Sequence, residues 1–159
     1  MATNVTEQNM SEPIIRAKMV TAENFATQKT MADCGEYGTL VFDEPVAHGG
    51  TGEGPSPLQG VLSALCACES VTFNRTAAEM GFEYKKLSFS AEYKIDIRGR
   101  LGMRGVTQHF KIVRVEIQVE TQEAVERLEE VVKETELRCP VYNLIQNAGV
   151  DITCQWIRV

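Results

Sequence analysis

The chain has 159 residues, 43% of them hydrophobic and 24% charged, which suits one globular domain with a real core and leaves no room for a second full domain. The formal net charge is −6, so nucleic acid and anionic membrane surfaces are not the expected partners. No window approaches the roughly 20 apolar residues that a spanning helix needs, and the polar first residues lack a signal-peptide core. We therefore expect a cytoplasmic protein.

The N-terminal third predicts a tail, a small sheet and a long loop. Residues 1–12 are expected to be disordered, and residues 13–159 to form a single domain. Three β-favouring pieces between Pro13 and Asp43 predict an antiparallel meander: PIIRAKMV, NFATQKTMA and YGTLVFD. The stretch EPVAHGGTGEGPSP then holds four glycines and three prolines, which predicts a loop. Long loops inside compact domains are more often functional than idle.

A long helix is predicted from Pro57 to about Met80. Proline favours the first turn of a helix, Ser56 precedes it as a candidate N-cap, and Gly81 supplies the C-terminal stop. Nearly the whole circumference of the first half of this helix is apolar. Such a helix is buried on all sides, so we expect it at the centre of the core or of an oligomer.

The rest of the chain alternates strands and helices. Two strands are indicated by clean alternation, KLSFSAEYKIDI and FKIVRVEIQVE, the second with Val113, Val115, Ile117 and Val119 inward. Thr121 is a candidate cap for a helix over QEAVERLEEVVKETEL. A short helix is expected to start at Cys139 and Pro140 and end at Gly149, before a last strand, VDITCQWIRV. The fold class is therefore α/β in the mixed, α+β sense.

Five cysteines, at positions 34, 66, 68, 139 and 154, do not form a metal site by spacing. Residues two apart on a helix point about 200° away from each other, so Cys66 and Cys68 cannot share one ion. Neither histidine lies at ligand spacing to a thiol, and we expect no metal and no bound cofactor. Cys34 and Cys154 are read as small packing residues, and free thiols as the default state in a reducing compartment.

Cysteine redox chemistry is possible with fewer groups, since one thiolate attacks and a second cysteine closes a disulfide. Cys139 is the natural second thiol, because the N-terminus of the helix that follows it favours a thiolate. Cys68 is the better candidate for the first thiol, because of the helix face that its three- and four-residue spacing from other apolar residues gives it. Spacing alone establishes neither role, and two buried cysteines are the alternative.

The stretch DEPVAHGGTGEGPSPLQGVLSALCACESVTF, followed later by CPVYNLI, resembles the OsmC/Ohr superfamily of organic-hydroperoxide-reducing and stress-induced proteins. The resemblance covers roughly residues 13–159. It implies an OsmC-like fold in which antiparallel sheets wrap around central cysteine-bearing helices in an intertwined homodimer. It also implies a peroxidase that reduces organic hydroperoxides through Cys68 as the attacking thiol and Cys139 as the resolving thiol, with a dithiol as reductant. Cys66 falls where the family usually has a small residue.

The chain differs from the family's peroxidases in the residues that would activate the attacking sulfur. Those proteins carry a glutamate just after the loop proline to hold a catalytic arginine, and here Leu58 and Gln59 stand at that place. Arg16 and Arg75 are candidate substitutes for the missing cation. Glu69 is a lone carboxylate on a buried helix and must find a donor or be protonated. It is expected either to form a structural salt bridge across the dimer or to have a role beside the thiols.

Two other functions remain open at this point. Leu58 and Gln59 favour a protein that binds a small hydrophobic ligand in the dimer pocket, with the cysteines as packing. A sulfur-transfer or thiol-modifying enzyme is the third possibility, and it would carry a persulfide on Cys68.

Overall fold

The computed structural model describes residues 12–159. The disordered tail expected at residues 1–12 lies almost wholly outside this part of the chain and stays a prediction. The described chain forms two compact units, residues up to Ser56 and residues from Pro57 onward, and each is described by itself. The expected single domain over residues 13–159 also stays a prediction.

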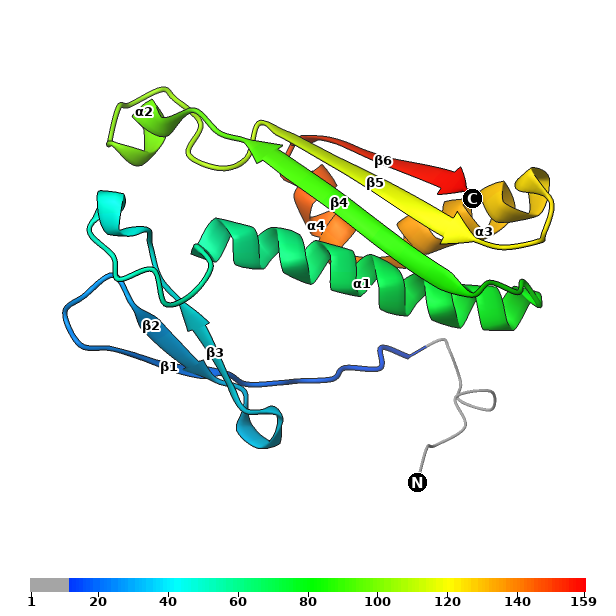
Figure 1. The fold of residues 1–159 in the computed structure, drawn as a ribbon, viewed down its shortest axis with the longest axis horizontal. Helices are drawn as coiled ribbons and strands as arrows, with labels where there is room; N and C mark the ends of the chain where they lie inside the picture. Colours follow the sequence, from blue (N-terminus) through cyan, green and yellow to red (C-terminus); the bar gives the residue numbers. More distant parts are fainter. Residues whose placement is uncertain (1–11) are drawn as a thin grey trace. The chain divides into compact units, whose positions relative to one another are not determined.

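The first unit contains a three-stranded antiparallel sheet (Figure 1). Its strands are β1 (Thr21–Asn24), β2 (Thr30–Asp33) and β3 (Thr39–Phe42), in the order β1-β2-β3. The predicted meander is confirmed, but the first strand was placed too early, at residues 13–20. The side-chain amide of Asn24 donates to the carbonyls of Thr27 and Lys29, both at 2.8 Å. This closes a tight turn directly after Asn24, which sets the position of the strand.

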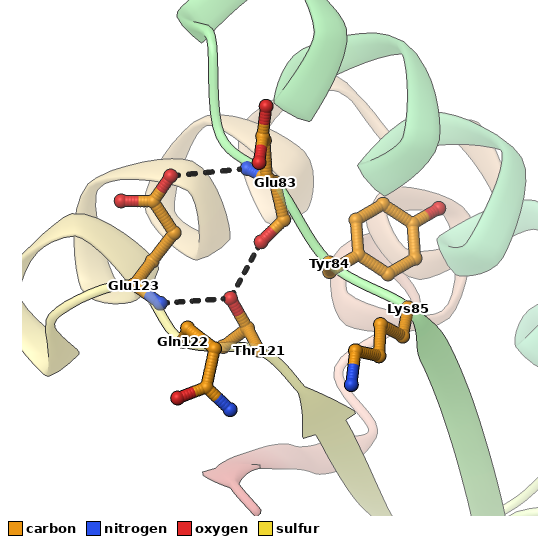
Figure 2. A pocket seen from close by; sticks show the side chains of 6 residues that line it. All are labelled: Glu83, Tyr84, Lys85, Thr121, Gln122 and Glu123. Carbon is orange, nitrogen blue, oxygen red and sulfur yellow. Dashed lines mark hydrogen bonds between the residues drawn. The ribbon is translucent and has the colours of Figure 1, made fainter.

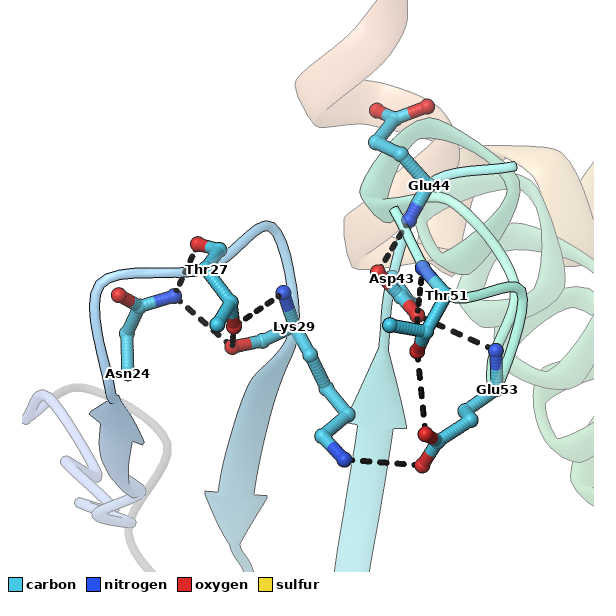
Figure 3. Close-up of polar contacts among 7 residues, drawn as sticks. All are labelled: Asn24, Thr27, Lys29, Asp43, Glu44, Thr51 and Glu53. Carbon is cyan, nitrogen blue, oxygen red and sulfur yellow. Dashed lines mark hydrogen bonds and ion pairs between the residues drawn. The ribbon is translucent and has the colours of Figure 1, made fainter. Parts of the chain in front are cut away.

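A buried carboxylate organises the loop that follows β3 (Figure 3). Asp43 has no accessible surface, and its oxygens accept hydrogen bonds from the backbone N–H groups of Glu44 (2.8 Å), Thr51 (3.0 Å) and Glu53 (3.1 Å) and from the Thr51 hydroxyl (2.6 Å). These bonds, with the Thr51 hydroxyl the largest contribution, hold the pKa of Asp43 well below its usual range. Lys29, directly before β2, also pairs with Glu53 at 2.8 Å. The glycine-rich loop, with a 3-10 turn η3 (Val46–His48), is therefore ordered by one acid.

The second unit begins with α1 (Pro57–Met80), at the bounds predicted from its proline and glycine. The helix ends in a Schellman motif, because Gly81 adopts a positive φ of 64° and Phe82 donates its backbone N–H to the carbonyl of Ala77 at 2.8 Å. Only one stripe of α1 is covered by the chain itself. Its buried members are Leu62, Leu65, Glu69, Phe73, Thr76 and Ala77. The prediction of burial on all sides is thus wrong for a single chain, in which Val61 and Val71 are exposed.

A second sheet, in the order β4-β5-β6, lies over α1 in this unit (Figure 1). Its strands are β4 (Lys86–Lys94), β5 (Ile112–Glu120) and β6 (Asp151–Arg158), and a short helix, α2 (Ile97–Arg100), separates the first two. The predicted inward residues of β5 are confirmed, since Val113, Val115, Ile117 and Val119 are all buried. One face of the sheet therefore belongs to the core and the other is polar.

The last strand runs parallel to β5, which corrects the expectation of antiparallel sheets. Between β5 and β6 the chain passes through α3 (Val125–Arg138) and α4 (Pro140–Asn147). A helical crossover of this kind returns the chain to the edge from which the preceding strand began, so the next strand runs in the same direction.

The start of α3 also differs from the prediction. Its N-cap is Ala124, without a side-chain cap, and Thr121 lies outside the helix. The Thr121 hydroxyl instead donates to the Glu83 carbonyl and accepts the Glu123 N–H at 3.1 Å (Figure 2). These residues line a 260 Å³ surface pocket with Tyr84 and Lys85. Thr121 thus joins the two connecting segments, and the pocket's polar groups bond mainly to one another.

None of the helices within residues 12–159 is both long enough and apolar enough to cross a membrane.

Candidate active site

The junction between α3 and α4 positions the most deeply buried cysteine. Cys139 is the N-cap of α4 and has no exposed surface, and its Sγ accepts the backbone N–H of Tyr142 at 3.5 Å. The side-chain amide of Asn143 reaches back and donates to the carbonyls of Glu136 (2.8 Å), Leu137 (3.3 Å) and Cys139 (2.9 Å). One asparagine therefore ties the end of α3 to the start of α4 and holds Cys139 in place.

The buried stripe of α1 faces this junction. Leu65, Glu69 and Phe73 have no exposed surface, and Cys68 is half-buried beside them. Residues three and four apart share one helix face. The side chains of Cys68 and Glu69 therefore both neighbour that of Leu65. The apolar run of α1 thus carries one thiol and one carboxylate into the interior.

Three groups meet there: the thiols of Cys68 and Cys139 and the carboxylate of Glu69. The Cys139 thiol lies close enough to both the Glu69 carboxylate and the Cys68 thiol for each of them to raise its pKa. Both cysteines are free thiols. The structure therefore brings together the two cysteines that the sequence pointed to, with an acid directly beside them.

Glu69 is a buried acid without a conventional partner. Among the described residues, neither carboxylate oxygen makes a hydrogen bond of normal geometry, although the Cys139 thiol is near enough to stabilise the charged form. Burial is the largest effect and, together with the Glu136 charge, raises the pKa of Glu69 to about 7. The expected alternative, a structural ion pair across the dimer, involves a second chain and stays a prediction. At neutral pH the Glu69 carboxyl exchanges readily between its two protonation states.

The Cys139 thiol is not activated as the sequence predicted. The Tyr142 N–H and the start of α4 favour a thiolate, but burial outweighs them and raises the pKa of Cys139, and the nearby Glu69 charge adds to this effect. A helix N-terminus that is itself buried thus fails to produce a stable thiolate. Cys139 needs a base if its sulfur is to attack anything.

Further groups surround the central three. Cys66 of α1 and Cys154 of β6 are half-buried, and burial raises the pKa of both thiols. Tyr142 is buried, which raises its pKa to about 12. Glu136 is half-buried, and burial raises its pKa despite a hydrogen bond that it accepts from Trp156 Nε1 at 3.2 Å. The surroundings are therefore acidic and thiol-rich.

Trp156 forms the floor of this cluster. Its ring stacks on Phe73, with centroids 5.0 Å apart and an interplanar angle of 17°. Phe73 in turn makes edge contacts with Phe82 and Tyr84, at 5.9 Å and 5.1 Å between centroids. The aromatic group closes the cluster at the C-terminal half of α1 and leaves an apolar medium in which electrostatic effects are strong.

The other predicted supporting residues lie elsewhere. Gln59 is exposed in the first turn of α1, about 13 Å along the axis from Cys68, and Arg75 is exposed about 10 Å beyond it. Arg16 is exposed in the first unit. The main influences on the pKa of Glu69 and of Cys139 within residues 12–159 include no lysine or arginine. A cation beside Cys68 is thus not supplied by the second unit in this arrangement.

The part of the chain that the structure describes contains no group of three or more histidine, cysteine or acidic side chains arranged to hold a metal ion. The cluster itself offers thiols and a carboxyl with a pKa of about 7. Two adjacent thiols can exchange electrons as a dithiol and disulfide, and the carboxyl can move a proton.

This fold and site define an α+β protein with two small sheets and a pair of helix-borne cysteines. Residues 50–155 match the family described as OsmC-like protein, and the chain belongs to that family. No curated protein matches the chain.

Solved structures share the fold over almost the whole chain. An OsmC-like protein from Mycoplasma pneumoniae matches with a TM-score of 0.76 and 18% identity, covering 91% of this chain and 99% of that one. An organic hydroperoxide resistance protein OsmC from Legionella pneumophila matches with a TM-score of 0.65 and 17% identity, covering 91% and 99%. An organic hydroperoxide resistance protein from Elizabethkingia anophelis matches with a TM-score of 0.71 and 11% identity, covering 93% of this chain and 100% of that one. At these identities the likeness establishes the α+β fold.

Sequence reasoning missed Glu136 and left Cys154 out of the site. Glu136 follows the buried Thr135 on α3, and no pattern in the sequence marks it as half-buried. Cys154 does share a strand face with Ile152 and Trp156, as predicted, but that face turns toward Glu69 and Cys66. One signal in the sequence could have placed Cys154 in the site. It shares a strand face with Trp156, and a face that carries a tryptophan is expected to pack against the core.

Proposed function

We propose that the protein is a thiol-dependent peroxidase that reduces organic hydroperoxides through Cys68 and Cys139. The observation that carries the proposal is the contact between these two thiols, one half-buried and one fully buried. Membership of the OsmC-like family supports it, and so do the fold relatives that are called organic hydroperoxide resistance proteins. A reducing, cytoplasmic compartment would keep both thiols free.

The proposed reaction has two chemical steps and a reset. The Cys68 thiolate attacks the outer peroxide oxygen, the O–O bond breaks, and the alcohol leaves with a proton while Cys68 becomes a sulfenic acid. Cys139 then attacks the Cys68 sulfur, the S–S bond forms, and the hydroxyl leaves as water. A small dithiol reduces the disulfide by two exchange steps and is itself oxidised.

We further propose that the working form is a homodimer. The face of α1 opposite the buried stripe exposes Val61 and Val71, with Ala64 and Ala67 also exposed between them. An apolar helix face of this kind suits burial against a second copy. Sedimentation of the purified protein tests this, since a monomer across micromolar concentrations contradicts it.

Hydroperoxide consumption tests the activity. Purified protein with dithiothreitol should consume cumene hydroperoxide catalytically, and Cys68→Ser should abolish turnover. Cys34→Ser is the matched control, because Cys34 belongs to the first unit whereas Cys68 and Cys139 belong to the second, and it should keep turnover. If the parent protein shows no turnover, or Cys68→Ser behaves like the parent, the proposal is wrong.

A second function is favoured by one observation. An open apolar groove of 270 Å³ lies between the start of α1 and the end of α4. Its lining residues are Leu58, Val61, His109, Phe110, Leu144, Ile145, Ala148 and Val150. Binding of a small hydrophobic ligand there without turnover would leave Cys68 and Cys139 as thiols after one equivalent of peroxide. Mass spectrometry of the treated protein separates the two functions.

A further inference from the structure

We propose that Glu69 is the catalytic base and acid of the resolving step, in which it takes the proton from the Cys139 thiol and delivers it to the hydroxyl that leaves Cys68. This inference rests on the proposed peroxidase function and adds a residue and a pH dependence to it.

The position of Glu69 carries the argument. Its side chain has no exposed surface, and neither carboxylate oxygen has a hydrogen-bond partner of normal geometry among the described residues. An ionised carboxylate that is buried without a partner destabilises the folded state, whereas a protonated one costs much less. Among the groups of residues 12–159 that chiefly shift the pKa of Glu69, the Cys139 thiol favours its charged form, and Glu69 follows Cys68 directly in α1. The carboxyl is thus close to the Cys139 sulfur, one of the two sulfurs of the future disulfide.

The chemistry of Cys139 supplies the need for a base. A thiolate attacks a sulfenic acid, whereas a thiol does not, and Cys139 has no exposed surface through which water could remove its proton. Burial raises the pKa of this thiol, so a spontaneous thiolate is rare at neutral pH. A carboxylate in contact with the thiol removes that barrier locally.

The step balances without an outside reagent. Glu69 accepts the proton of the Cys139 thiol as the Cys139 sulfur attacks the Cys68 sulfur. The S–S bond forms, the S–O bond of the sulfenic acid breaks, and the leaving hydroxyl takes the proton from Glu69 to become water. Glu69 ends the step ionised, as it began, so it acts as a true catalyst.

The groups around Glu69 set the pH at which it can act. Five groups from the surrounding elements interact electrostatically with Glu69. They are Cys66 of α1, Glu136 of α3, Cys139 at the junction of α3 and α4, Tyr142 of α4 and Cys154 of β6. All of these are neutral or acidic. Burial and the Glu136 charge raise the pKa of Glu69, the Cys139 thiol lowers it, and the result is a pKa of about 7. A base with a pKa near the working pH is the most effective one.

Glu136 provides an internal comparison. It is the second carboxyl of the cluster, but Trp156 already donates a hydrogen bond to it, and it is not among the main influences on the pKa of the Cys139 thiol. It influences Glu69 through its charge, which raises the pKa of Glu69. Removal of that charge should therefore move the pH dependence of Glu69 to lower pH without abolishing it.

The test follows the sulfenic acid directly. Reduced protein is mixed with one equivalent of cumene hydroperoxide, samples are quenched with dimedone at increasing times, and mass spectrometry gives the rates at which the Cys68 sulfenic acid forms and disappears. The parent, Glu69→Gln, Glu69→Asp, Glu136→Gln and the exposed α3 control Glu130→Gln are compared between about pH 6 and pH 9, a range that brackets the expected transition.

In the parent, the rate of sulfenic acid loss should rise with pH and level off above a midpoint close to 7. Glu69→Gln should slow that loss about 100-fold and remove the levelling, with formation of the sulfenic acid little changed. Glu69→Asp should restore part of the rate and the levelling, Glu136→Gln should lower the midpoint, and Glu130→Gln should match the parent.

Two results overturn the inference, and they differ in what else they overturn. If the parent closes the disulfide and Glu69→Gln closes it at the same rate with the same pH profile, Glu69 is not the base, and the peroxidase function stands. If the parent forms no Cys68 sulfenic acid or no disulfide with Cys139, both the function and the inference are wrong. A thermal unfolding midpoint for Glu69→Gln at or above that of the parent shows that slow closure is not a folding defect.

Discussion

The Cys68 thiol lies close enough to the Cys139 thiol to raise its pKa, although β4, α2, β5 and α3 lie between the two residues in the chain. Cys68 comes from the middle of α1, and Cys139 from the junction of α3 and α4. Their contact depends on the packing of α1 against both later helices, so the pair is a property of the folded core. Changes that loosen this packing should weaken the pair without touching either sulfur.

Asn143 should be one such position. Its side-chain amide donates to three carbonyls at the junction, those of Glu136, Leu137 and Cys139. Asn143→Ala leaves these carbonyls without that donor, and we expect a loss of about 1–3 kcal/mol in the free energy of unfolding. Urea denaturation measures it. Asn147→Ala, at the exposed end of α4, is the control, and an equal effect of both substitutions would show that the junction does not depend on Asn143.

Glu69 should make the protein less stable as the pH rises through the neutral range. Its pKa is raised from 4.5 to about 7 in the folded state, so between these values the folded state binds more protons than the unfolded state. Stability then falls with increasing pH across this window and levels off above it. The full effect is on the order of 3 kcal/mol.

Urea denaturation of the parent and of Glu69→Gln between about pH 5 and pH 8 isolates this effect. The difference in unfolding free energy between the two proteins should grow with pH in favour of the glutamine variant. Glu130→Gln should show a constant difference. A difference for Glu69→Gln that is flat, or that shrinks with pH, would mean that Glu69 is not a buried acid of this kind.

Asp43 should control the order of the glycine-rich loop. Asp43→Asn removes the charge that holds the Thr51 hydroxyl and three backbone N–H groups, and we expect amides of residues 44–54 to exchange hydrogen at least about tenfold faster. Glu36→Gln, at an exposed 3-10 turn of the same unit, is the control. Protection that survives in Asp43→Asn would assign the order of the loop to its other contacts.

The well-predicted parts of the fold are those where single residues act locally. Pro57 and Gly81 gave the ends of α1 because proline and a positive-φ glycine determine backbone geometry by themselves. The alternation in β5 gave its buried face for the same reason. Alternation carries no information on strand direction, so the parallel course of β6 followed only from the crossover through α3 and α4.

The site shows the same division. Cys68, Cys139 and Glu69 could be singled out from the sequence as unusual residues. Their proximity could not be predicted from the residues alone, because it depends on tertiary packing. The thiolate expected at Cys139 was wrong because a helix N-terminus was considered without its burial. Glu136 gave no signal, since a glutamate on a helix is usually solvated and only its contact with Trp156 places it in the cluster.

The most direct test of the central claim is the disulfide that one equivalent of cumene hydroperoxide produces in the reduced protein. Peptide mapping under non-reducing conditions should show a single bond between Cys68 and Cys139, formed at the rate at which the peroxide disappears, with Cys34, Cys66 and Cys154 still free. Full recovery of five free thiols after the peroxide is added, or a bond that omits Cys68 or Cys139, would contradict the account.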